Sequence, residues 1–142
     1  DGAAATLVCS GEYAAANGLK PLARIKSIAV AGCSPEIMGI GPVGASRKAL
    51  ERAGLAPSDM DVVELNEAFA SQSLVCMDEL GFDAARVNIA GGAIAIGHPL
   101  GAGGARITGK AAAILARTGG RYALATQCIG GGQGIATVLE AA

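Results

Sequence analysis

The sequence predicts an α/β fold in which one mixed sheet is covered by helices. Short aliphatic runs alternate with segments of helical periodicity, and several of the expected helices are followed by glycine. Such alternation is typical of a sheet between helical layers. Two aliphatic runs at the end of the chain are separated by a glycine cluster, which predicts an antiparallel closing pair of strands.

The first part of the chain is expected to hold two strands and two helices. We expect strands at residues 5–9 and 22–33, helices at residues 12–17 and 43–53, and a loop at residues 35–42. The second helix carries small and aliphatic residues on one side and charged residues on the other, as expected of a helix that packs on a sheet. Gly18 and Gly54 follow the two helices and predict C-terminal caps.

The rest of the chain continues the alternation. We expect strands at residues 61–65, 86–90, 122–126 and 134–139, and helices at residues 67–80 and 103–118. The last of these helices has an apolar stripe with helical spacing, which should face the sheet. The stripe consists of Ile107, Ala111, Ile114 and Leu115.

The composition excludes several classes of function. With 142 residues, 51% of them hydrophobic, the chain is long enough for one folded domain. The net charge is −1 and basic residues are scattered among acidic ones, so we expect no nucleic-acid partner. No apolar run approaches the ~20 residues that a membrane-spanning helix needs, so we expect no membrane partner. A single histidine cannot help to build an ordinary zinc site, and we expect no metal.

The cysteines and the first residue suggest where the chain comes from. The four cysteines are widely spaced and form no C-x-x-C motif, which favours a reduced, cytoplasmic protein. The chain begins at Asp1, without an initiator methionine, in what reads as the approach to a strand. We therefore expect it to be a piece of a longer polypeptide.

The single histidine, His98, lies in the most glycine-rich stretch of the chain, residues 91–104. An imidazole in a backbone of minimal bulk suggests acid–base chemistry with room for a ligand. The helix expected from residue 103 points its positive end toward this loop, which would favour a neutral ring able to accept a proton. The alternative is a structural histidine in a tight turn before Pro99.

Cys128 is closely followed by three consecutive glycines, Gly130, Gly131 and Gly132. Such a segment can aim N–H groups at a ligand, as an oxyanion hole requires, and one such donor is worth roughly 3–4 kcal/mol in the transition state. A thiol near an imidazole or a helix terminus could also have its thiolate stabilised for proton transfer. The alternative is a core cysteine at the end of a strand.

Asn66 follows the strand expected at residues 61–65. At the carboxyl end of a sheet strand, its amide could face a cleft and hold a water or a substrate oxygen. The alternative is an N-cap of the next helix.

A separate motif, G-x-G-x-x-G at residues 39–44, matches the dinucleotide-binding pattern, but a loop-like segment precedes it and Pro42 lacks an N–H. We therefore expect no nicotinamide or flavin cofactor.

Four segments in this order and spacing resemble the carboxyl-terminal signatures of the thiolase family. They are residues 36–42, residues 66–70 (Asn-Glu-Ala-Phe-Ala), residues 91–99 and residues 128–134. The resemblance covers the whole chain and implies the carboxyl-terminal half of the αβαβα thiolase core. It implies that residues 1–20 are the last strand and helix of the amino-terminal half and that residues 21–142 form the carboxyl-terminal domain. The nucleophilic cysteine and most coenzyme A contacts would lie in the missing amino-terminal half.

The resemblance also implies roles for the candidate residues. His98 would take the proton from the nucleophilic cysteine, which then attacks a 3-oxoacyl-CoA or acetyl-CoA carbonyl. Cys128 would protonate the acetyl-CoA carbanion on cleavage, or remove the α-proton in condensation. Asn66, through a water, and His98 would form one oxyanion hole, and the Gly130 N–H would contribute to another. The apolar residues beside the acyl pocket would be Met38 and Phe69.

The resemblance further implies an acyltransferase with coenzyme A and acetyl-CoA as substrates, no tightly bound cofactor, and a homo-oligomer (dimer or tetramer). We expect the isolated chain to be inactive because the nucleophile is absent. Decarboxylating condensing enzymes share the fold, but they use a second histidine where this chain has Cys128. A non-catalytic acyl-CoA-binding or lipid-binding relative is the other alternative, although it would not need Asn66, His98 and Cys128 together.

Overall fold

A computed structural model describes all residues, 1–142, and contains one four-stranded mixed sheet. The strands are β1 (Ala23–Gly32), β2 (Val62–Leu65), β3 (Tyr122–Ile129) and β4 (Gln133–Ala141). Their order in the sheet is β1-β4-β3-β2. The pairs β1–β4 and β3–β4 are antiparallel, and β2–β3 is parallel. The predicted mixed sheet and its antiparallel closing pair are therefore confirmed.

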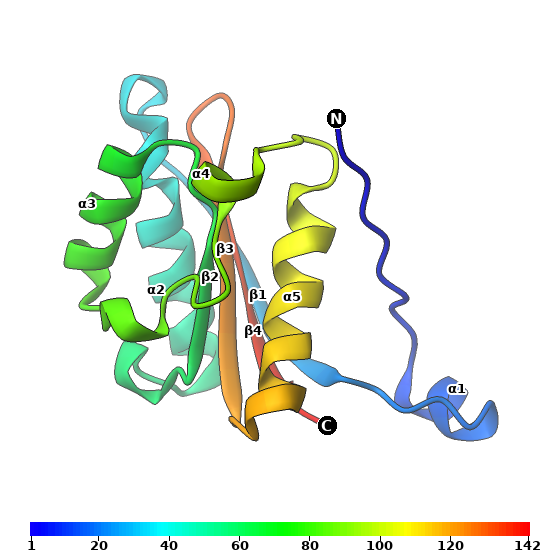
Figure 1. The fold of residues 1–142 in the computed structure, drawn as a ribbon. Coiled ribbons are helices and arrows are strands. Elements are labelled where there is room, and N and C mark those ends of the chain that lie inside the picture. Colours follow the sequence, from blue (N-terminus) through cyan, green and yellow to red (C-terminus); the bar gives the residue numbers. More distant parts are fainter.

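Helices cover both faces of this sheet. The longer helices are α2 (Gly41–Ala53), α3 (Ala70–Leu80) and α5 (Gly103–Thr118), and the short ones are α1 (Gly11–Ala16) and α4 (Ala93–Ile96). Helices α2 and α3 lie on one side of the sheet and α5 lies on the other, so the fold has three layers (Figure 1). Because β2 and β3 are parallel, their carboxyl ends lie at the same edge of the sheet. The loop that contains α4 passes this edge (Figure 1).

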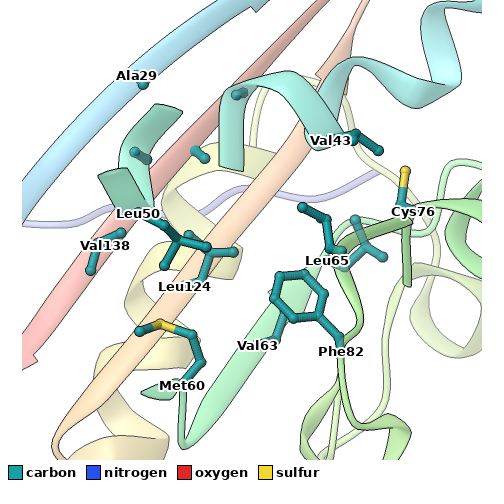
Figure 2. Packing of buried hydrophobic residues seen from close by; sticks show 14 residues of the cluster. Ala29, Val43, Leu50, Met60, Val63, Leu65, Cys76, Phe82, Leu124 and Val138 are labelled. Carbon is teal, nitrogen blue, oxygen red and sulfur yellow. The ribbon is translucent and has the colours of Figure 1, made fainter. Parts of the chain in front are cut away.

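The core consists of two apolar clusters, one on each face of the sheet. On the α2 and α3 side, Leu124 of β3 and Val138 of β4 face Leu50 of α2 (Figure 2). On the α5 side, the predicted stripe of α5 is buried against small strand residues such as Ala123 and Ala125. Successive residues of β3 thus alternate between the two clusters, as the period of two in a strand requires.

Glycine decides how closely the layers approach at the start of α2. A Cβ on Gly41 would lie 2.2 Å from the carbonyl oxygen of Gln133, and a Cβ on Gly134 would lie 2.1 Å from the backbone of Gly41. The two backbones can touch here only because neither residue has a side chain. Residues 39–44 span the end of a 3₁₀ helix (Pro35–Ile40) and the start of α2 and do not follow a strand, so this glycine motif serves packing and does not form a dinucleotide loop.

Several boundaries differ from the prediction. The helix expected from Val43 already begins at Gly41, and the loop expected before it is mostly the 3₁₀ helix. The helix expected from Glu67 begins at Ala70, with Phe69 as its N-cap residue. The short helix α4 was not expected. Only α5 has both of its predicted ends.

Two expected strands are not formed. Residues 86–90 make a single parallel bridge, Val63 to Val87, because Asn88 turns the chain with a φ of 49° and bonds Leu65 through its side chain. Residues 5–9 have no strand partner either. An extended segment needs a neighbouring strand for its hydrogen bonds, and this one instead runs along the outer side of α5 (Figure 1).

None of the helices combines the length and the apolar character needed to cross a bilayer.

Candidate active site

The candidate site begins at the carboxyl end of β2. The backbone N–H of Asn66 donates to the carbonyl of Thr126 at 2.9 Å, so Asn66 continues the ladder one residue beyond the strand. Its side chain is 1% exposed. Asn66 is not the N-cap of the next helix, because α3 begins at Ala70, its N-cap residue is Phe69, and no side chain caps it. The buried amide therefore needs partners of another kind.

His98 is the first of these partners. It follows Gly97, which has a φ of 93° and ends α4. The Asn66 Nδ2 and the His98 Nε2 lie 3.3 Å apart, within hydrogen-bond distance. His98 itself is exposed and lines a depression of about 450 Å³ with residues 96–101 and the first two residues of the chain. An imidazole in contact with a buried amide on one side and solvent on the other can exchange protons with a ligand in that space.

Glu67 anchors the loop that carries His98. One carboxylate oxygen accepts the backbone N–H of Ile94 at 2.9 Å, and the other accepts the Asn88 amide at 3.1 Å. Gly92 leaves the necessary room, since a Cβ there would lie 2.3 Å from the Glu67 carboxylate. In the sequence, Glu67 is expected only at the start of a helix. The position of Glu67 in the sequence does not indicate its hydrogen bond to Ile94, which lies 27 residues further along the chain.

Three charged side chains lie beneath the site. Arg106 of α5 donates from Nη2 to Asn66 Oδ1 at 3.1 Å. Glu64 of β2 is 1% exposed and pairs with Lys110 of α5 at 3.0 Å, while Lys110 also donates to the carbonyl of Gly91. Burial raises the pKa of Glu64, and the Lys110 ammonium opposes that shift. None of these residues was singled out from the sequence, because the contacts join segments far apart in the chain.

Cys128 lies in β3, two residues beyond Thr126. Thr126 bonds Ser46 of α2 at 3.2 Å, so strand alternation directs Cys128 to that same face of the sheet. No hydrogen bond joins its thiol to His98 or Asn66. Burial raises the pKa of the Cys128 thiol. The expectation that its thiolate would be stabilised is therefore wrong for this structure, since desolvation favours the neutral thiol.

The glycines after Cys128 form the turn between β3 and β4. Gly131 and Gly132 have φ values of 82° and 86°, which favour glycine. Gly132 also lies against the backbone of Cys33 and accepts its N–H at 2.8 Å. Gly130 is exposed, and its N–H donates to no other group of the chain. The turn therefore leaves one backbone donor free at the carboxyl end of β3.

The two apolar residues proposed from the sequence lie on different elements. Met38 is half-buried in the 3₁₀ helix before α2. Phe69 precedes α3 and is 62% exposed. A large aromatic side chain with that exposure is free to contact a ligand or another chain segment.

Residues 19–141 match the sequence profile of the family described as "Thiolase, C-terminal domain". The chain belongs to the thiolase family. The 3-oxoadipyl-CoA/3-oxo-5,6-dehydrosuberyl-CoA thiolase of Escherichia coli K12 is 59% identical to this thiolase domain, over 99% of the chain and 35% of the relative. A 3-ketoacyl-CoA thiolase of Vibrio parahaemolyticus is also 59% identical, over 99% of the chain and 37% of the relative.

Solved structures agree with this assignment. The crystal structure of human mitochondrial 3-ketoacyl-CoA thiolase matches with a TM-score of 0.90 and 51% identity, over 93% of the domain and 34% of that chain. A structure of the human enzyme in complex with CoA matches with a TM-score of 0.91 and 50% identity, over 94% and 34%. The thiolase domain thus spans about a third of the length of the relatives it matches, and the thiolase-like layered fold is confirmed.

Proposed function

We propose that this chain supplies the proton-transfer residues of a thiolase, an acyltransferase that cleaves 3-oxoacyl-CoA with coenzyme A and, in reverse, condenses two acetyl-CoA molecules. The observation that carries the proposal is the contact between the buried Asn66 amide and the exposed His98 ring. A histidine with only a structural role would need neither the open depression beside it nor the charged Arg106 side chain that bonds its partner Asn66. In this proposal residues 1–20 belong to the amino-terminal half of the enzyme and residues 21–142 to its carboxyl-terminal domain.

His98 is the base of the first step. The imidazole takes the proton of a cysteine thiol that the rest of the polypeptide provides, and the resulting thiolate attacks the thioester or keto carbonyl. The thiolate–carbonyl adduct then carries a negative oxygen. Donors held rigidly in place stabilise such an oxygen because they need not reorganise during the reaction. Asn66, through a water, and His98 provide donors on one side, and the free N–H of Gly130 provides one on the other.

Cys128 is the second acid–base group. Since burial raises the pKa of its thiol, the group is protonated at neutral pH and suits donation of a proton to the acetyl-CoA carbanion released on cleavage. In the condensing direction the same sulfur takes the α-proton back. Because the turn after β3 is made of glycine, a thioester can approach the sulfur without meeting side chains.

Substrate and partners follow from the same assignment. Coenzyme A and acetyl-CoA are substrates, and no tightly bound cofactor takes part. Met38 and Phe69 line the acyl pocket. Phe69 is exposed, so its ring is available to contact an acyl group. We infer a cytoplasmic enzyme that works as a dimer or tetramer and draws its nucleophile from the amino-terminal half.

A chimera tests the proposal directly. Residues 1–142 replace the matched segment of the Escherichia coli 3-oxoadipyl-CoA thiolase, which is 59% identical, and thiolysis of 3-oxoadipyl-CoA is followed as loss of the thioester. We expect turnover, and we expect His98→Ala and Cys128→Ala each to lower kcat by about 10²-fold or more, the usual share of a general acid or base. Arg117→Met, at the far end of α5, is the control that should keep full activity. A folded chimera that binds the substrate without turning it over would instead indicate the non-catalytic relative.

A further inference from the structure

The free edge of the sheet lies along β1. This strand is the first in the sheet order and pairs only with β4, so its other edge has no neighbouring strand. Residues 27–32 (Ser-Ile-Ala-Val-Ala-Gly) contain no charged residue and no proline, and Ile28 and Val30 are 46% and 45% exposed. A long apolar edge strand of this kind is a template for pairing with another chain unless something blocks it.

Two cations of α2 cover this edge. Arg52 Nη1 donates to the carbonyl of Ile28 at 2.5 Å, and Lys48 Nζ donates to the carbonyl of Val30 at 3.4 Å. The spacings agree, because residues four apart in a helix rise ~6 Å and residues two apart in a strand rise ~6.6 Å. Both cationic side chains are exposed, and no carboxylate lies within ion-pair distance of either one. Their hydrogen bonds therefore go to the strand edge and not to an acidic partner.

The backbone geometry shows which positions a second strand would use. In an antiparallel pair, residues that bond the neighbouring strand alternate with residues whose N–H and C=O both point away from it. The carbonyls of Ile28 and Val30 meet α2 side chains at the free edge, so their N–H groups point to that edge too. Nearer the start of β1 the edge is irregular, because the register with β4 shifts between Ile25 and Ser27. The part of the edge that is regular enough to pair is the part that the two cations cover.

We propose that Lys48 and Arg52 prevent β1 from pairing with the β1 strand of a second copy of this chain. Each side chain occupies a carbonyl that an incoming strand would need. An antiparallel β1–β1 pair centred on Ala29 would also bring the Lys48 and Arg52 side chains of both copies together, and like charges that meet across an interface oppose association. The inference concerns the edge of the sheet alone and does not rest on the proposed acyltransferase activity.

Sedimentation equilibrium of the 142-residue chain measures the self-association. The double variant Lys48→Met/Arg52→Met frees the edge, and we expect its dissociation constant for self-association to fall by about tenfold or more relative to the unmodified chain. The matched control is Arg47→Met/Arg117→Met, which also removes two exposed cations but none that bonds β1. Because both double variants change the net charge equally, the control should keep the dissociation constant of the unmodified chain.

Amide hydrogen exchange locates the contact. In Lys48→Met/Arg52→Met the N–H groups of Ile28 and Val30 should exchange more slowly as the protein concentration rises, whereas the N–H of Ala29, which faces β4, should not respond. Adding Ile28→Lys to the double variant returns a charge to the edge and should restore the dissociation constant of the unmodified chain. If the double variant does not fold, Lys48→Met alone should show the same concentration-dependent slowing at Val30.

The proposal is overturned if the double variant associates no more strongly than the Arg47→Met/Arg117→Met control. It is also overturned if association leaves the exchange at Ile28 and Val30 unchanged, because the contact would then lie on a face of the chain and not at the edge. Slow exchange of both N–H groups in the unmodified thiolase chimera at every concentration would overturn it too, since another segment of the polypeptide would cover the edge. An inactive chimera would contradict the proposed function and leave this inference standing.

Discussion

Substitution of Gly92 by alanine should release the loop that carries His98. The φ and ψ of Gly92, −130° and −163°, are open to alanine, so the backbone itself gains no strain. The added methyl group would, however, lie 2.3 Å from one oxygen of the Glu67 carboxylate and 2.5 Å from its carbon. Glu67 can rotate away, but it then loses its bonds to Ile94 and Asn88, at 2.9 and 3.1 Å.

The size of the effect follows from those two bonds. A hydrogen bond to a charged group contributes about 1.5–3 kcal/mol when buried, and Glu67 is half-buried, so we expect Gly92→Ala to lower the free energy of unfolding by about 2 kcal/mol. Urea unfolding of the chain measures this. Gly101→Ala is the control, because a Cβ there meets nothing within 4 Å, and it should change stability by less than about 0.5 kcal/mol.

A double-mutant cycle identifies the cause. If the cost comes from displacing Glu67, then Glu67→Ala should itself cost about 2 kcal/mol, and adding Gly92→Ala to it should cost almost nothing more. Costs of Gly92→Ala and Glu67→Ala that simply add would refute the reasoning, since the glycine would then be required for some other contact. A cost of Gly92→Ala below that of the Gly101→Ala control would refute it as well.

Two further predictions concern the fold. The backbone N–H groups of Tyr122 and Arg121 donate to the Asp61 carboxylate at 3.0 and 2.7 Å and lower its pKa, Tyr122 having the larger effect. The stability that these bonds provide is therefore present above the ordinary pKa of aspartate. It is lost as the pH falls through the lower pKa of the folded state. Asp61→Ala should therefore cost about 1 kcal/mol in urea unfolding at pH 7, given that the carboxylate is exposed, and a cost that persists at about pH 2 would contradict this. Leu124→Ala, at the fully buried centre of the sheet, should cost 2–5 kcal/mol by the same measurement, and a loss under about 1 kcal/mol would contradict the packing.

Local sequence patterns were sufficient to predict an element where residues within that element determine its structure. The apolar stripe predicted for α5 is an example, since all four of its residues are buried and the helix has the predicted bounds. The strand expected at residues 86–90 fails because Asn88 closes onto Leu65, a contact that the apolar residues around it do not reveal. The strand expected at residues 5–9 has the right composition but no partner, and pairing is not a local property.

The site was predicted only in part for the same reason. His98 and Asn66 were recognised separately, from glycine content and from a strand end, and the structure brings them into contact. The residues that hold them, Arg106 and Glu67, look like ordinary helix-surface charges in the sequence. Their hydrogen bonds join residues 40 and 27 positions apart in the sequence, and no periodic sequence pattern indicates contacts of that kind. Cys128 was recognised, but its burial reverses the expected direction of its pKa shift.

The most direct test of the acid–base assignment separates two partial reactions in the thiolase chimera. Exchange of labelled coenzyme A into acetyl-CoA requires only acylation of the nucleophile, whereas condensation of two acetyl-CoA molecules also requires removal of an α-proton. We predict that His98→Ala abolishes both reactions, while Cys128→Ala abolishes condensation and leaves the exchange within about tenfold of the unmodified chimera. Equal loss of both reactions in the two variants, or exchange that survives without His98, would contradict the assignment.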